Sequence, residues 1–153
     1  MKRNEFVPWF LATLICVSFL PSAAVAQQTD EEMVIQTLKG MWAAMENGDV
    51  DTYIGYVHPD YTVFGENDPY LAAGRNLELR NTTSYLQNAR DVHTEMHQPK
   101  VTIRGDVAWI TYYWTDTGVT SEGSFSTRGK STRIFVREGG RWLCIHAHFT
   151  AVP

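Results

Sequence analysis

The chain has 153 residues and a formal net charge of −4, from 13 basic and 17 acidic side chains. This length is typical of one domain with a sizeable core. A mildly acidic chain has no general electrostatic attraction for nucleic acid or for anionic lipid, so neither is expected as a partner.

The segment 1–26 has the layout of a secretory signal peptide. Lys2 and Arg3 precede an apolar run over 6–20, and small residues end at Ala26. This layout predicts cleavage after Ala26 and a periplasmic or secreted domain over 27–153. The alternative, a retained anchor, is less favoured because the run of about 15 residues is shorter than the roughly 20 that span a membrane. We therefore expect no stable membrane anchor.

Two helices are predicted at the start of the domain. Thr29 and Glu32 have the spacing of a capping box, and apolar residues then recur at helical spacing. Asn47-Gly48 is expected to end this helix. Asp49 can cap a second, shorter helix, which Pro59 is expected to close because the residue before a proline avoids the helical region.

The rest of the domain is predicted to be mostly sheet. A short strand is expected over 61–64, a loop over 65–74 and a helix over 75–89. Alternating patterns then predict four long strands, over 93–104, 107–117, 124–138 and 141–150. Their short connections contain glycine, which predicts antiparallel hairpins. Helices followed by a meander indicate an α+β domain with helices on one face of a curved sheet.

Four motifs occur in a characteristic order: Glu46-Asn47-Gly48-Asp49, His58-Pro59-Asp60, Gly105-Asp106, and a run containing Thr132-Arg133, Gly140-Arg141-Trp142 and His146-x-His148. Together they resemble the nuclear transport factor 2-like superfamily, in particular SnoaL-like proteins and the association (hub) domain of calcium/calmodulin-dependent protein kinase II. The resemblance implies a cystatin-like cone, in which a long N-terminal helix closes a strongly bent antiparallel sheet over a pocket. Because this fold hosts isomerases, cyclases, dehydratases, transport factors and assembly hubs, the function has to be argued from the site.

The resemblance also implies where the pocket lies. Arg133 matches one arginine of the basic pocket of hub domains, whereas Trp114 and Phe149 stand where two others are expected, and Glu78 stands near the place of a histidine. Strand alternation then gives a set of predicted pocket residues: Trp42, Phe64, Tyr112, Trp114, Arg133, Phe135 and Phe149, with Ile110, Ile145 and Ala147 also inward. One arginine among aromatic rings suits a small, mostly apolar molecule with one carboxylate or carbonyl. No cofactor is expected.

Alternatives remain for these residues. The aromatic side chains could form an ordinary core rather than a binding site. An inward Arg133 could be satisfied by the protein itself, because arginine is rarely buried unless paired and Glu78, Glu95 or Asp116 could supply a carboxylate. Otherwise, Arg133 anchors a ligand.

The opposite face of the sheet is unusually apolar for a surface. It is predicted to carry Trp109, Thr111, Tyr113, Ile134, Val136, Cys144, His146 and His148. Such a face usually marks an interface, so we expect a homodimer or larger homo-oligomer with Trp109, Tyr113, His146 and His148 in contact. A metal at His146 and His148 would need a third ligand, and because no motif supplies one, no metal is expected. Cys144 is expected to be a buried, unreactive thiol.

Catalysis would require a carboxylate base opposite an oxyanion donor. The candidate bases are Asp60, Glu78 and Asp116, and the candidate donors are Tyr112, Tyr56 and Tyr61. Because no spacing forces a pair together, the first hypothesis is an exported binding or assembly domain for a small organic acid or apolar ligand. The alternative is a ketosteroid isomerase-like or SnoaL-like enzyme of proton transfer, cyclisation or dehydration. A third hypothesis is a structural dimer whose interior is filled.

Overall fold

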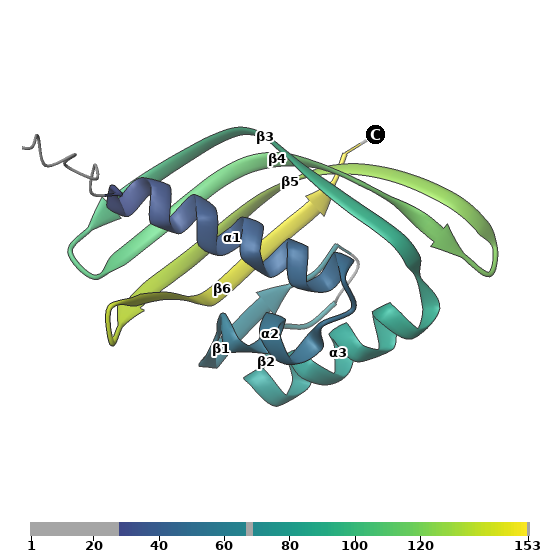
Figure 1. Cartoon of the computed structure of the whole chain (residues 1–153), viewed down its shortest axis with the longest axis horizontal. Coiled ribbons are helices and arrows are strands. Elements are labelled where there is room, and N and C mark those ends of the chain that lie inside the picture. The colour runs from purple at the N-terminus through teal and green to yellow at the C-terminus, as the bar shows by residue number, and fades with distance from the viewer. Residues whose placement is uncertain (1–27, 67–68, 153) are drawn as a thin grey trace, which may run out of the picture.

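The computed structural model describes residues 28–66 and 69–152 (Figure 1). The predicted signal peptide and its cleavage site lie outside these residues. Within the described part of the chain, no helix is long and apolar enough to cross a membrane.

Both N-terminal helices form as predicted, and each begins at its predicted cap. Helix α1 spans Asp30–Glu46, where the side chain of Thr29 accepts a hydrogen bond from the Glu32 amide at 3.2 Å and Glu32 Oε2 accepts one from the Thr29 amide at 2.8 Å. Helix α2 spans Val50–Gly55 and is capped by Asp49. The capping box therefore fixes where α1 starts.

Pro59 does not end a helix, contrary to the sequence prediction. Helix α2 already ends at Gly55, and strand β1 spans Val57–Phe64, so His58-Pro59-Asp60 lies within a strand. The pairing of β1 with the C-terminal strand shifts register between Val57 and Thr62. A proline is tolerated in such an irregular segment because the regular ladder does not need its missing amide donor there.

A strand that was not predicted, β2 (Ala72–Ala73), lies in the segment expected to be a loop over 65–74. The elements after it confirm the predicted order of one helix and four long strands: α3 (Arg75–Asn88), β3 (Arg90–Arg104), β4 (Val107–Thr120), β5 (Gly123–Glu138) and β6 (Arg141–Ala151). Strands β4 and β5 extend through most of the predicted loop at 118–123, which leaves a turn of two residues between them. The sheet has the order β2-β1-β6-β5-β4-β3.

One strand pairing differs from the expected all-antiparallel sheet. Strand β1 runs parallel to β6, with Thr62 beside His146 and Phe64 beside His148. The other pairings are antiparallel. Glycine-containing hairpins predict the direction of β3 to β6, but β1 joins β6 without a hairpin, so that rule does not apply to it.

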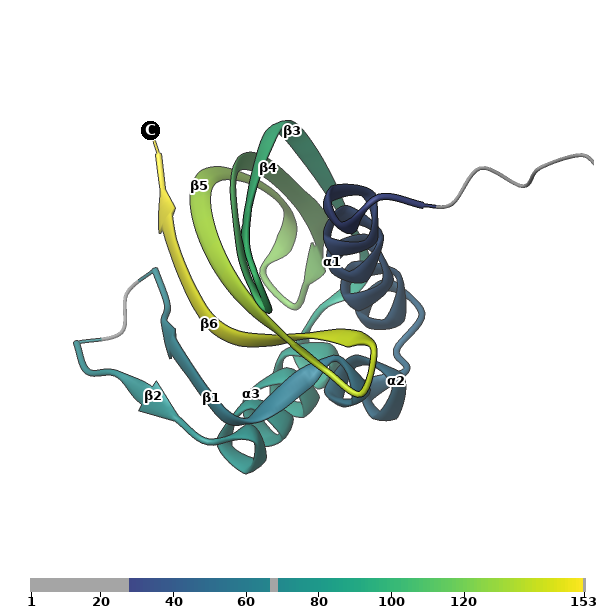
Figure 2. The same cartoon turned by 90° about the vertical axis from the view of Figure 1, so that its left-hand side faces the viewer.

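Helices cover one side of a strongly bent sheet. In Figure 1, α1 crosses the concave side of β3 to β6. Helix α3 lies beside β1 and β2, and α2 lies next to α3. Figure 2 shows how far the sheet curls around α1. Apolar side chains of α1 and of the inner sheet face form the core, among them Val34, Leu38, Met41, Ala108, Ile110, Phe135 and Ala147. The α+β fold with a bent sheet is therefore confirmed.

A bulge in β6 changes the predicted faces of two residues. Ile134 pairs with His146 and Phe135 pairs with Cys144, so Ile145 is the extra residue between them. Such a residue reverses the alternation on one side of the bulge. Cys144 is consequently buried in the core rather than on the outer face, and Ile145 is only partly buried. The prediction that Cys144 is buried is confirmed, and burial raises the pKa of its thiol to about 11.

Candidate ligand-binding site

A cavity of about 650 Å³ lies between the helices and the concave face of the sheet. This volume falls within the roughly 300–1,000 Å³ of small-molecule sites. The lining residues come from α1, α2, α3, five strands and the segment 65–66 that follows β1. A cavity of this size contradicts the hypothesis of a filled interior.

Arg133 lies in the wall of this cavity with part of its guanidinium unused. The residue is 9% exposed, and its Nε donates to the hydroxyl of Tyr112 at 3.0 Å. Its Nη1 is buried and has no hydrogen-bond partner. Among the described residues, no carboxylate lies within 4.0 Å of the guanidinium. The protein therefore does not pair Arg133 with Glu78, Glu95 or Asp116.

Most of the predicted aromatic residues reach the cavity. Trp42, Tyr112, Trp114 and Phe149 line it, and the rings of Trp42 and Tyr112 meet edge to face with centroids 5.5 Å apart. Phe135 is fully buried in the core and does not line the cavity. The prediction for these four residues thus agrees with the geometry, whereas Phe135 belongs to the layer beneath.

The predicted position of Phe64 is wrong. Its side chain is 41% exposed, and its ring lies beside His148 and His146 on the outer face of the sheet, with centroid distances of 5.6 and 6.1 Å. In β1 it is Tyr61 and Val63 that point inward and line the cavity. Alternation along the strand then turns Thr62 and Phe64 outward.

Two glycines let aromatic rings lie flat on the sheet inside the cavity. Gly129 pairs with Trp114, and a Cβ at Gly129 would lie 2.2 Å from the indole ring. Gly118 pairs with Phe125, and a Cβ there would lie 2.7 Å from the phenyl ring. Since both rings line the cavity, these glycines determine the shape of its wall.

Glu78 provides one carboxylate of the cavity, as predicted for a candidate base. Its Oε1 accepts hydrogen bonds from the hydroxyl of Tyr53 at 2.5 Å and from that of Thr82 at 3.5 Å. Burial and the charge of Glu78 raise the pKa of Tyr53, whereas Arg133 lowers it. Tyr53 therefore lies within the fields of both Glu78 and Arg133.

Asp116 provides a second carboxylate, further along β4. It accepts hydrogen bonds from Thr94 Oγ1 at 3.1 Å and from the Tyr85 hydroxyl at 3.3 Å. Burial raises the pKa of Asp116 more than these hydrogen bonds lower it. Glu66 also lines the cavity, and burial together with the charge of Asp116 raises its pKa. This region thus holds two carboxylates close enough to repel each other.

Asp60 does not reach the cavity, so its predicted role as a base is wrong. It is exposed, and its amide donates to His58 Nδ1 at 3.0 Å. The other ring nitrogen of His58 lies 3.2 Å from Glu138 Oε1. Among the predicted donors, Tyr61 and Tyr112 line the cavity, whereas Tyr56 packs against α1 at Gly40.

The predicted interface residues lie on the outer face. Trp109 is 36% exposed and Tyr113 is 51% exposed. Thr62 Oγ1 lies 2.9 Å from His146 Nδ1, and burial together with the charge of His148 lowers the pKa of His146. In the described part of the chain, no group of three histidine, cysteine or acidic side chains could hold a metal ion.

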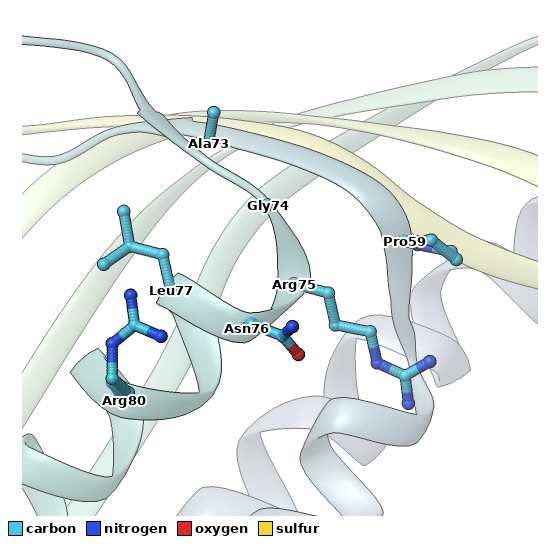
Figure 3. Close-up of a pocket in the computed structure, with 7 residues that line it drawn as sticks. All are labelled: Pro59, Ala73, Gly74, Arg75, Asn76, Leu77 and Arg80. Atoms are coloured by element: carbon cyan, nitrogen blue, oxygen red, sulfur yellow. The ribbon is translucent and has the colours of Figure 1, made fainter.

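A second cavity of about 400 Å³ lies between β1, β2 and the start of α3. Figure 3 shows its lining residues, Pro59, Ala73, Gly74, Arg75, Asn76, Leu77 and Arg80. None of them is a predicted site residue, and none is aromatic. The larger cavity is therefore the better candidate site.

Several polar residues of the larger cavity were not among the predicted pocket residues, chiefly Tyr53, Thr82, Tyr85 and Ser131. Glu78, Thr82 and Tyr85 are spaced i, i+4 and i+7, so they lie on one face of α3. This face is polar and carries no apolar periodicity. A search for polar residues at helical spacing would have found it.

Bent sheet, closing helix and internal cavity together define a cone-shaped α+β domain. Residues 34–153 match the family model described as the SnoaL-like domain, so the chain belongs to this family. The expected SnoaL-like family is thereby confirmed.

The proteins that this chain resembles include a kinase, a kinase hub and, in fold, a candidate dehydratase. The chain is 32% identical over 133 residues to calcium/calmodulin-dependent protein kinase type II of Caenorhabditis briggsae, which covers 84% of this chain but only 24% of the kinase. The kinase hub of S. rosetta has a TM-score of 0.70 at 25% identity, covering 82% of this chain and 99% of the hub. A candidate dehydratase of the NTF2-like family from Streptomyces avermitilis has a TM-score of 0.75 at 20% identity, covering 81% and 96%.

Proposed function

We propose that this chain is an exported, self-associating domain that binds a small, mostly apolar ligand and holds a carboxylate or carbonyl of that ligand on Arg133. The observation that carries the proposal is that Arg133 lines a cavity of about 650 Å³ while no carboxylate among the described residues lies within 4.0 Å of its guanidinium. Aromatic walls at Trp42, Trp114 and Phe149 would hold the apolar body of the ligand.

The energetics of Arg133 support a ligand. A buried charge without a carboxylate partner destabilises a fold, because its lost hydration is not replaced. Tyr112 satisfies only Nε. An anionic oxygen of a ligand at the guanidinium would form a charge-assisted hydrogen bond, which is about twice as strong as a neutral one.

Binding can be tested by a thermal-shift screen of the purified protein against small organic acids and carbonyl compounds, followed by calorimetric titration of each hit. Arg133→Met should abolish binding, because methionine keeps an unbranched side chain but has no donor. Arg104→Met is the matched control, since Arg104 is exposed at the end of β3. Equal affinities of wild type and Arg133→Met for every hit would show that Arg133 does not bind the ligand.

In the absence of ligand, the Arg133→Met protein should also be more stable than the wild type. Arg133→Met removes an unpaired buried charge, so its melting temperature without ligand should rise. Residues retained for binding often lower stability in this way. A lower melting temperature would mean that the contact with Tyr112 outweighs the cost of burying the charge.

A second candidate function is proton-transfer catalysis. It is favoured by one observation: Glu78, a possible base, and Arg133 with Tyr112, possible oxyanion donors, line the same cavity. Each hit from the screen can be incubated with the protein in heavy water. An enzyme would exchange a carbon-bound proton of the hit for deuterium, and Glu78→Gln would stop this exchange while leaving binding at Arg133 intact. A pure binding domain would give no exchange with either protein.

A further inference from the structure

The charges in the larger cavity do not balance. Among the described residues that line it, Arg133 is the only basic one, whereas three are acidic: Glu66, Glu78 and Asp116. A ligand carrying only a carboxylate would add to this excess of negative charge. A ligand that also carries a cation would reduce it.

The acidic residues differ in position relative to Arg133. Glu78 accepts a hydrogen bond from Tyr53 at 2.5 Å, and the charges of Glu78 and Arg133 both affect the pKa of Tyr53. Glu78 therefore lies on the Arg133 side of the cavity. Asp116 follows Tyr112 by four residues on β4, which is about 13 Å along a strand at about 3.3 Å per residue. Tyr112, Trp114 and Asp116 alternate on the inner face, so an aromatic wall connects the guanidinium to Asp116.

The negative region at Asp116 has hydrogen-bond donors but no cation. Asp116 accepts from Thr94 and Tyr85, both neutral, and no basic side chain lies within 4.0 Å of it among the described residues. Glu66 adds a second carboxylate to the same region. Burial and this repulsion raise the pKa of Glu66, as expected where a counter-ion is missing.

We propose that the ligand is an elongated zwitterion with an aromatic or aliphatic body, whose carboxylate binds Arg133 and whose ammonium group binds Asp116 and Glu66. This inference rests on the proposed binding function and specifies its ligand class. Arg133, which lines the same cavity and has no carboxylate within 4.0 Å among the described residues, is the independent sign that this cavity takes a ligand. An α-amino acid is too short to bridge the two regions, so the charges must lie at opposite ends of the molecule.

The test uses three probes of one shape. The zwitterion is para-(aminomethyl)phenylpropanoate, the matched acid is para-ethylphenylpropanoate, and the matched amine is para-propylbenzylamine. Calorimetric titration of the wild type should give about tenfold tighter binding of the zwitterion than of the acid, and weaker binding of the amine than of the zwitterion, as expected for a charge-assisted contact at each end.

Variants locate the two ends. Asp116→Asn should reduce the preference for the zwitterion over the acid to about equal affinity, whereas Asp51→Asn, an exposed position on α2, should leave it at about tenfold. Arg133→Met should abolish binding of both acids. The probe comparison on wild-type protein does not depend on how any variant folds.

Each outcome decides between the two proposals. Equal binding of zwitterion and acid by the wild type overturns the zwitterion but leaves the proposed function standing. A preference that is lost in Glu78→Gln and kept in Asp116→Asn overturns the assignment of the cation to Asp116. Absence of binding by all three probes and by every acid of the screen overturns both proposals.

Discussion

Two glycines decide how much space the cavity keeps beside β4 and β5. Gly129 and Gly118 each lie under an aromatic ring of the facing strand. Glycine within a strand costs stability unless a neighbouring ring covers it. Trp114 and Phe125 provide this cover, and the rings consequently lie along the sheet rather than across the cavity.

Gly129→Ala should therefore distort the site. Its Cβ would meet the indole of Trp114 at 2.2 Å and the carbonyl oxygen of Thr150 at 2.5 Å, so the ring has to move. We expect a loss of about 2 kcal/mol in the free energy of unfolding and weaker binding of any ligand. Gly55→Ala is the control, because no atom lies within 4 Å of a Cβ there. Denaturant unfolding of both variants measures the difference.

Asp116 should make stability depend on pH in an unusual direction for a carboxylate. Its pKa in the folded protein is raised by burial, so the folded state binds a proton more readily than the unfolded chain. Stability from this group therefore falls as pH rises through the folded pKa. The melting temperature of wild type minus that of Asp116→Asn should decrease between about pH 4 and about pH 7. An increase over this range would contradict the assigned shift.

Single residues were predictable where the strands are regular. Tyr112, Trp114 and Arg133 face the cavity as alternation along β4 and β5 required. Phe64 was not predictable, because β1 carries apolar side chains on both faces and alternation alone does not say which face is inward. The sequence also could not predict that Arg133 lacks a carboxylate partner, because an ion pair that does not form has no sequence pattern.

Among the elements, α1 depends on a cap that the sequence identifies. The side chains of Thr29 and Glu32 bond to each other's amides, which satisfies two amide donors at the start of the helix. Thr29→Ala should lower the free energy of unfolding by about 1 kcal/mol. Thr29→Ser keeps the hydroxyl and should cost much less in the same denaturant titration. Equal losses in both variants would show that the cap is not what stabilises this end.

Boundaries of the other elements were predictable wherever glycine or a change of period marks them. The hairpins at Gly105-Asp106 and Gly139-Gly140 form where expected. The bulge at Ile145 and the parallel pairing of β1 with β6 were not predictable. Both depend on contacts between strands distant in sequence, and neither requires a special residue at the position concerned.

At the scale of the molecule, the outer face of the sheet carries several exposed apolar residues. Phe64, Val107, Trp109 and Tyr113 are exposed on β1 and β4, beside His146 and His148 of β6. Exposed aromatic side chains gathered on one face usually mark an interface. The likeness to a kinase hub is consistent with self-association, and we propose that this face mediates it.

Trp109→Asp should convert the proposed oligomer into monomers, because a charge buried at an apolar interface has no partner. Light scattering coupled to gel filtration measures the mass of each species. Gln36→Asp on α1 introduces the same charge at an exposed helical position and should leave the mass unchanged. A Trp109→Asp protein with the wild-type mass would place the interface elsewhere.

The parallel pairing of β1 with β6 has a consequence for the timing of folding. Thr62 pairs with His146, and β6 lies between β1 and β5 in the sheet order. A strand near the start of the domain must therefore wait for the last strand to be synthesised before it can be incorporated. The nascent domain therefore lacks its completed sheet until β6 has been synthesised, and an incompletely folded domain would suit translocation through a membrane pore if the domain is exported as proposed.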